Sequence, residues 1–173
     1  MQVFPTYVVV VLVWMVACPE PTRDSAPLRI ESIHSSTARF TVQRAVWAAA
    51  QRLACPQCAN VLSDFRDAGG RTIRARLDLL GETPGHYLRR ITFREAVDHR
   101  CHDPEKLAFT SVGSPEVFIC STQFWRKYQE DPRYIEAVII HEMMHTLGLG
   151  ENPPSSSEIS ARVRKRCWSS DCE

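Results

Sequence analysis

The chain lacks several features that would assign it to familiar classes of protein. Its 21 Lys and Arg residues nearly balance its 20 Asp and Glu residues, and the net charge of +1 excludes a global attraction to nucleic acid or to an anionic membrane. The N-terminal apolar run, residues 8–17, covers only ten residues, whereas a helix needs about 20 to cross a bilayer. No internal repeat occurs, which excludes a solenoid.

The length and composition predict one domain of the α+β class. A chain of 173 residues suits a single domain, and its hydrophobic fraction of 44% is enough to build a buried core. Helical patterns come first, short strands follow, and a helix–turn–helix pattern ends the chain. We therefore expect a short mixed or antiparallel sheet packed on helices, with the functional helix near the C-terminus.

The N-terminal apolar run indicates export. Residues 8–17 have the length of a signal-peptide core, although no Lys or Arg precedes them. The run ends in Ala17-Cys18, which resembles a bacterial lipobox, so Cys18 is a candidate for lipidation; cleavage after Ala17 and free secretion is the alternative. We expect a signal segment over 1–18, an exposed tether over 19–30, and the folded domain over 31–173.

The seven cysteines agree with export. Without Cys18, six remain, which suits three disulfides in an exported protein, but the sequence does not reveal their pairing. Cys55 and Cys58 have the spacing of a redox or structural-zinc motif. Because no second such motif occurs, a structural disulfide role is favoured for them. We expect Cys167 and Cys172 to pin the C-terminal tail.

The most informative segment is His141-Glu142-Met143-Met144-His145. Residues four apart on a helix share one face, so His141 and His145 can bind one metal ion. Glu142 points to the neighbouring sector, where it can accept a proton from water without ligating the metal. Zinc lowers the pKa of bound water to about 7 and so supplies hydroxide at neutral pH.

The surroundings of this segment predict a buried helix. Residues 137–140 are apolar, and Met143, Met144 and Leu147 continue the pattern. Buried polar groups without partners are costly, and a bound metal would explain why His141 and His145 occur there. The alternative is a core helix whose histidines are satisfied by ordinary hydrogen bonds.

The extended pattern His141-Glu142-x-x-His145-x-x-Gly148-x-x-Glu151 resembles the active-site helix of zincin metallopeptidases, with metzincin-like spacing. The resemblance implies a zincin-like domain with one catalytic Zn²⁺, in which Gly148 turns the chain and returns the eleventh residue to the metal. That residue is Glu151 instead of His, as in snapalysin-like enzymes. The metzincin Met-turn is absent. A gluzincin arrangement would use Glu158 instead, but Ser155 and Glu158 also have capping-box spacing.

Periodicity also predicts the remaining elements. Asp131 and Pro132 are expected to cap the helix that carries His141. In zincins an edge strand before this helix pairs with extended substrate, and Val117, Phe118 and Ile119 are our candidates for it; an internal strand is the alternative. Helices are predicted over 41–54, 61–65, 71–80, 123–130 and 155–167, and strands over 91–93, 107–110 and 116–120.

The sequence thus predicts an exported zinc metalloendopeptidase with Glu142 as general base and His141, His145 and Glu151 as metal ligands. Its partners would be peptide or protein substrates, with no nucleic acid, and a membrane only through an N-terminal lipid anchor. The alternative is a non-catalytic, disulfide-stapled surface lipoprotein whose zinc-binding helix is structural.

Overall fold

The computed structural model describes residues 27–172. The predicted signal segment, Cys18 and most of the predicted tether lie outside these residues. Within them, no helix is both long and apolar enough to cross a membrane. The strands are β1 (Arg29–Glu31), β2 (Thr92–Glu95), β3 (Ala108–Phe109) and β4 (Glu116–Ile119), and the helices are α1 (Ser36–Arg52), α2 (Pro56–Ala59), α3 (Val61–Asp64), α4 (Ile73–Leu79), α5 (Pro84–Arg90), α6 (Ser121–Glu130), α7 (Pro132–Thr146) and α8 (Ser156–Cys167), with 3₁₀ turns η1 (His99–His102) and η2 (Ser170–Cys172).

The sheet is small and mixed, which confirms the predicted α+β class. Its strand order is β1-β2-β4-β3. The first three strands run parallel, with Phe93 of β2 opposite Val117 of β4, while β3 runs antiparallel to β4. β4 is therefore an internal strand, and β3 forms the edge next to α7.

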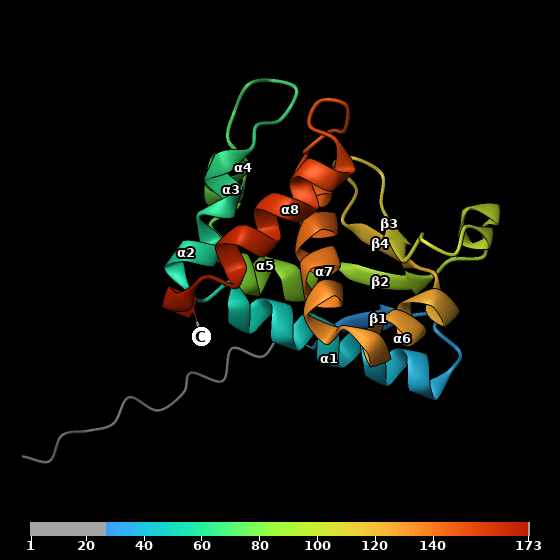
Figure 1. Cartoon of the computed structure of the whole chain (residues 1–173). Helices are drawn as coiled ribbons and strands as arrows, with labels where there is room; N and C mark the ends of the chain where they lie inside the picture. The colour runs from blue at the N-terminus through green and yellow to red at the C-terminus, as the bar shows by residue number, and fades with distance from the viewer. Residues whose placement is uncertain (1–26, 173) are drawn as a thin grey trace, which may run out of the picture.

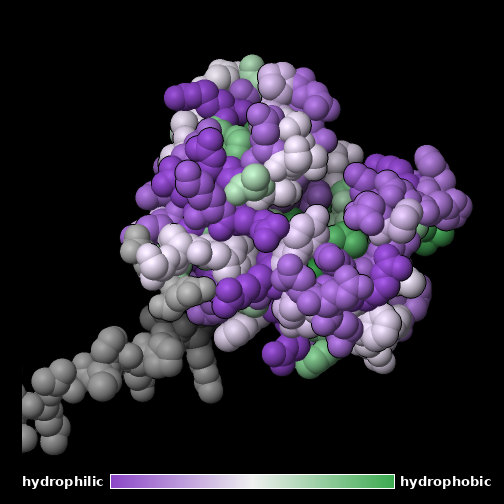
Figure 2. Space-filling view, in the orientation of Figure 1, coloured by the Kyte–Doolittle hydropathy of each residue, from purple (hydrophilic) through white to green (hydrophobic). Residues whose placement is uncertain are grey.

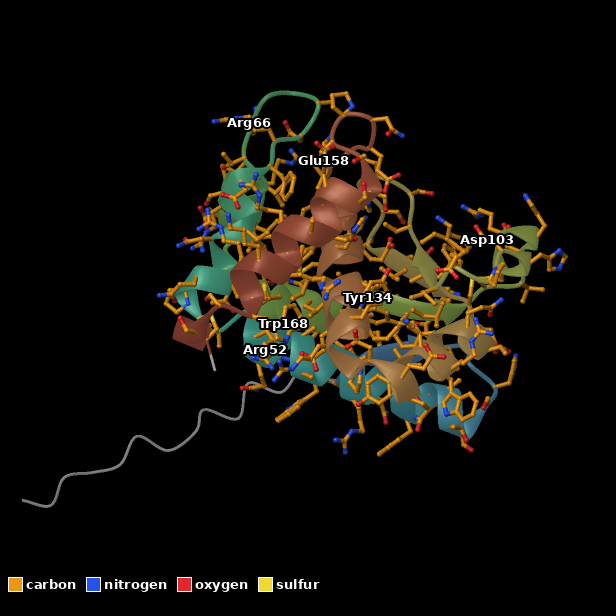
Figure 3. All side chains as sticks on the ribbon, in the orientation of Figure 1. Arg52, Arg66, Asp103, Tyr134, Glu158 and Trp168 are labelled. Atoms are coloured by element: carbon orange, nitrogen blue, oxygen red, sulfur yellow. A yellow bond between two sulfur atoms is a disulfide. The ribbon has the colours of Figure 1, made fainter. Side chains whose placement is uncertain are left out.

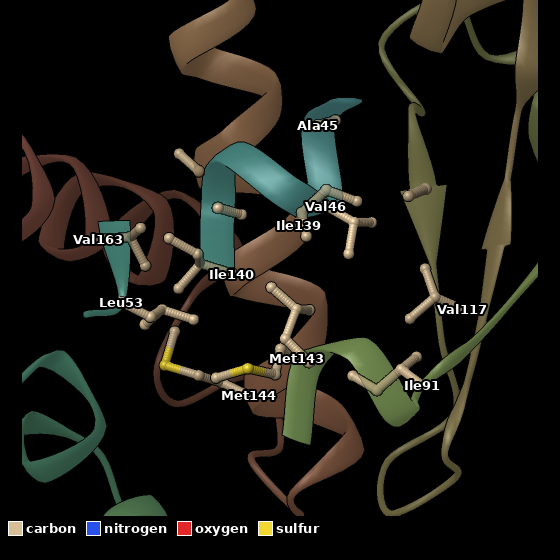
Figure 4. Close-up of a cluster of buried hydrophobic side chains, with 14 of the residues drawn as sticks. Ala45, Val46, Leu53, Ile91, Val117, Ile139, Ile140, Met143, Met144 and Val163 are labelled. Atoms are coloured by element: carbon tan, nitrogen blue, oxygen red, sulfur yellow. The ribbon is translucent and has the colours of Figure 1, made fainter. Parts of the chain in front are cut away.

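Alternating burial decides which face of the sheet meets the helices. Phe93, Val117 and Ile119 are buried, whereas their neighbours along the strands are partly exposed. The buried side chains pack with those of α1 and α7 in one hydrophobic core. Figure 4 shows the part of that core around Met143 and Met144, which project from α7 between α1 and the turn at Ile91.

α7 occupies the centre of the molecule. Figure 1 shows the sheet on one side of α7 and α8 on the other, with α1 running along the lower edge. α7 packs on α1, α6, α8, β3 and β4. A helix with neighbours on so many sides must be apolar around most of its circumference, which explains the near-continuous apolar run of its sequence.

The structure differs from the predicted elements at the start of the first helix, at the end of the tether and at helices that were not predicted. The first helix begins at Ser36, five residues before 41, because the Ser35 hydroxyl accepts a hydrogen bond from Ala38 N–H at 3.3 Å and caps it. The prediction that residues 19–30 form a tether is wrong at its end, since β1 starts at Arg29 and pairs with β2. Helices α2 and α5 were not predicted; Thr83 caps α5 and Pro84 occupies its first turn.

Three disulfides cross-link the described residues. Cys55 bonds to Cys172 and Cys58 to Cys167, so both cysteines of the predicted motif tie α2 to the C-terminal segment. This confirms a structural role for the motif and the pinning of the tail. Cys101–Cys120 joins η1 to the start of α6. Such bridges point to an oxidising environment, extracellular or periplasmic.

The two tail disulfides close nearly the same loop. Removing one of them should therefore lower stability less than removing the second as well, because the remaining bridge still closes the loop. Replacing Cys55 and Cys172 by Ala leaves Cys58–Cys167 closing a separation of 109 residues. We expect this change to lower the free energy of unfolding by roughly 3 kcal/mol, and removal of both bridges to lower it at least twice as much. Urea unfolding under oxidising conditions measures both values; equal losses would contradict the shared-loop explanation.

Candidate metal centre

The candidate site is built on the C-terminal half of α7. The helix begins as predicted, with Asp131 Oδ1 accepting a hydrogen bond from Tyr134 N–H at 3.0 Å. Because α7 lies between the sheet and α8, the polar residues of the motif are buried. His141, Glu142 and His145 are only 4%, 7% and 5% exposed.

A tight turn returns the chain to these histidines. α7 ends at Thr146, and Gly148 adopts φ +104°, a conformation that glycine reaches at low cost. Leu149 N–H donates to Met144 O at 3.0 Å and closes the turn. Glu151 Oε1 then lies 3.2 Å from His145 Nε2 and 3.5 Å from His141 Nε2. The predicted role of Gly148 in the turn is confirmed.

Each histidine is held through its outer nitrogen. His145 Nδ1 lies 2.7 Å from Leu149 O, and a carbonyl only accepts, so Nδ1 carries a proton; in the neutral imidazole Nε2 then presents a lone pair. His141 Nδ1 lies 3.0 Å from Ser160 Oγ of α8. Contacts of this kind orient the imidazole ligands of metal sites. The two Nε2 atoms face each other at 2.8 Å.

The donor set fits a divalent metal ion. The Nε2 pair can be bridged by one proton or by one cation. Glu151 adds a carboxylate, a further donor that suits a divalent cation, and Glu142 lies beside the group on α7. In the described part of the chain, His141, His145 and Glu151 are the one group of His, Cys, Asp or Glu donors close enough to hold an ion, with their atoms within 4.8 Å of one another.

The environment of Glu142 suits a group that accepts and donates a proton near neutral pH. Burial raises the pKa of Glu142 to about 8, although the charge of Lys106 opposes the shift. Its Oε2 atom is buried and has no hydrogen-bond partner among the described residues. Burial, and then the charge of His145, lower the pKa of His141 to about 4. The imidazole is therefore neutral at neutral pH, as a metal ligand must be.

The site opens into a cleft between α7 and β3. The cavity has a volume of about 330 Å³, and its lining includes Ala108 and Phe109 of β3, Val138 and Tyr134 of α7, and the charged side chains of Arg100, Glu105 and Lys106. Figure 2 shows this hollow, with hydrophobic atoms on its floor and hydrophilic ones along the rim. Gly113 N–H donates to His145 O at 2.9 Å and fixes the loop after β3 against α7.

The expectation that Val117, Phe118 and Ile119 form the substrate-pairing edge is wrong. β4 is hydrogen-bonded to β2 on one side and to β3 on the other, so it has no free edge. The edge belongs to β3, where Phe109 pairs with Phe118 and their rings stack at 5.5 Å. The short run 107–110 offered no signal of its edge position, because pairing order depends on tertiary contacts.

Glu158 lies away from the histidines. Its carboxylate accepts from Ser155 N–H at 2.7 Å and closes the capping box at the start of α8, where Figure 3 shows it at the end of the helix. This hydrogen bond lowers the pKa of Glu158. Sequence reasoning missed Ser160 and Lys106, which are remote from the motif and carry no pattern of their own.

Comparison with known proteins adds no relative. No family model matches the chain, and no curated protein or solved structure matches it either. The assignment of a function therefore depends on the residues of the site and on their geometry.

The raised pKa of Glu142 predicts that the metal-free protein loses folding stability as the pH rises. The pKa of Glu142 in the folded chain, about 8, lies above the ordinary carboxyl value of 4.5, so ionisation of this group costs no stability below pH 4.5 and costs progressively more as the pH rises toward 8. Glu142→Gln removes the loss. We expect metal-free Glu142→Gln to gain stability over the parent chain progressively between pH 5 and pH 8. Urea unfolding in the presence of a chelator measures the difference, and a constant difference would contradict the assignment.

The positions of the two glutamates predict unequal effects on metal affinity. Glu151→Ala removes a donor, so we expect the dissociation constant for Zn²⁺ to rise by at least about 100-fold, more than the loss of an outer contact to a ligand costs. Glu158→Ala should change it little and instead lower helix stability through the lost cap. Competition with a chromophoric chelator measures both constants. The reverse ranking would move the third ligand to Glu158.

Proposed function

We propose that this chain is an exported zinc-dependent metalloendopeptidase. The observation that carries the proposal is the buried Glu142 carboxyl, whose Oε2 atom has no partner among the described residues, beside the donor group of His141, His145 and Glu151. A structural zinc site is closed by four protein ligands and needs no such carboxylate. Of residues 27–172, only three donors converge, which leaves room for water and substrate.

The chemistry follows from the positions of these groups. Zinc, when bound, lowers the pKa of water and polarises a carbonyl group. Glu142 accepts one proton as the oxygen of water attacks the scissile carbonyl carbon. It returns that proton to the amide nitrogen as the C–N bond breaks. One peptide and one water give one carboxylic acid and one amine, and Glu142 regains its initial state.

The cleft suits an extended peptide. β3 offers a free edge beside α7, and a peptide could add to this edge as a further strand, its backbone held by main-chain hydrogen bonds. The loop of η1 and residues 103–107 borders the same cleft and is held by Cys101–Cys120. In Figure 3, Asp103 marks the place where η1 ends and this loop continues. A fixed edge and a fixed loop would limit the conformations that a bound peptide can adopt.

The oxidising environment supports the exported part of the proposal. Every cysteine of the described residues is in a disulfide. Zinc ligation by cysteine is therefore excluded for this part of the chain, which leaves the nitrogen and carboxylate donors. This argues against the alternative of a closed structural zinc site in a surface lipoprotein.

Glu142→Gln tests the proposal directly. The amide keeps the size of the side chain but cannot accept the proton, so we expect hydrolysis of an unstructured protein such as casein to fall by roughly 10²–10⁴-fold. Zinc content, measured by elemental analysis, should stay near one ion per chain. Glu158→Gln serves as the matched control and should retain activity. Loss of zinc together with activity in Glu142→Gln would show that Glu142 ligates the metal or supports the fold.

A further inference from the structure

The outer face of α1 exposes two large aromatic side chains in line. Phe40 is 58% exposed and Trp47 is 65% exposed. They are seven residues apart, so they lie two turns apart on one face of the helix. Arg44 stands between them, with its guanidinium carbon 5.8 Å from the centre of the Phe40 ring. α1 contains three arginines and no acidic residue.

An apolar groove of about 680 Å³ continues this face. Leu28, Val46, Trp47 and Tyr128 line it, together with Arg44, Arg89 and Glu136. The Nε atom of Arg89 is buried without a hydrogen-bond partner in the described structure. Glu136 is paired with Arg52 at 3.3 Å, so its negative charge is already balanced. The two arginines therefore give the lining of the groove an unbalanced positive charge.

The chain enters the described structure at this groove. Pro27 is the first described residue, and Leu28 lines the groove beside Trp47. Cys18, the candidate for lipidation, precedes Pro27 by the eight residues 19–26. Eight residues span at most roughly 30 Å. A membrane that held a lipid on Cys18 would therefore lie within reach of α1.

We propose that this face of α1 and its groove form a docking surface for an anionic phospholipid membrane. Tryptophan and phenylalanine side chains partition into the interface between headgroups and acyl chains. Arginines beside them meet the lipid phosphates. The local patch supplies the attraction that the net charge of +1 does not.

The proposed orientation leaves the metal centre accessible. α1 runs along the lower edge of the molecule in Figure 1, whereas the end of α7 that carries His145 lies at the upper end. With α1 on the lipid surface, the cleft would face away from the membrane. Membrane docking and peptide hydrolysis are therefore separate properties and can be tested separately.

Vesicle binding tests the proposal. A chain that begins at residue 19 retains every described residue and the whole core, and lacks the apolar run. With its disulfides intact, we expect it to sediment with vesicles of phosphatidylcholine and phosphatidylglycerol, and far less with phosphatidylcholine alone. Phe40→Ser with Trp47→Ser should lower the partition coefficient by roughly tenfold. Arg44→Gln should lower it by roughly fivefold, and only on the anionic vesicles.

Leu79→Ser with Leu80→Ser is the matched control, since both leucines are exposed at the C-terminal end of α4, away from α1. It should leave binding unchanged, and both double variants should keep the melting temperature and zinc content of the parent. Equal loss in the control, or binding that ignores lipid charge, would overturn the proposal. So would a chain that binds no vesicles but binds a peptide of residues 8–17, because the groove would then receive the protein's own N-terminal segment.

Discussion

The burial of α7 is the constraint on which the rest of the structure depends. This helix has the sheet on one side and α8 on the other, so two histidines and a glutamate are placed where water cannot solvate them freely. Burial of such groups is costly unless each finds a partner. His145 finds the carbonyl of Leu149 and His141 finds Ser160, but the buried Oε2 atom of Glu142 finds no partner among residues 27–172. The proposed chemistry depends on this unsatisfied oxygen beside the facing imidazole nitrogens.

The elements around α7 hold these partners in place. Ser160 belongs to α8, and α8 is fastened at its far end by Cys58–Cys167 and near it by Cys55–Cys172. In Figure 3, Arg52 and Trp168 lie together at this end, with the guanidinium carbon 5.2 Å from the ring centre. On the other side, the loop after β3 is hydrogen-bonded to the last turn of α7. Packing and cross-links thus limit movement on both sides of the candidate metal centre.

The features that the sequence predicted correctly each depend on residues that lie close together in the chain. The cap at Asp131, the turn at Gly148 and the capping box of Ser155 and Glu158 are each set by residues within five positions of one another. The return of Glu151 to His145 also follows from local geometry, because one turn connects them. The edge strand was assigned wrongly, since which strand lies outermost depends on pairing between β3 and β4.

The sequence by itself therefore determined the buried helix, its ends and the spacing of its donors, because helix periodicity and turn preferences act between near neighbours. It also determined that six cysteines were available for cross-links. Only the tertiary structure decided their pairing, the position of β3 at the edge, and the approach of Ser160 and Lys106 to the histidines. These contacts join residues far apart in the chain, and the packing of the whole core selects them.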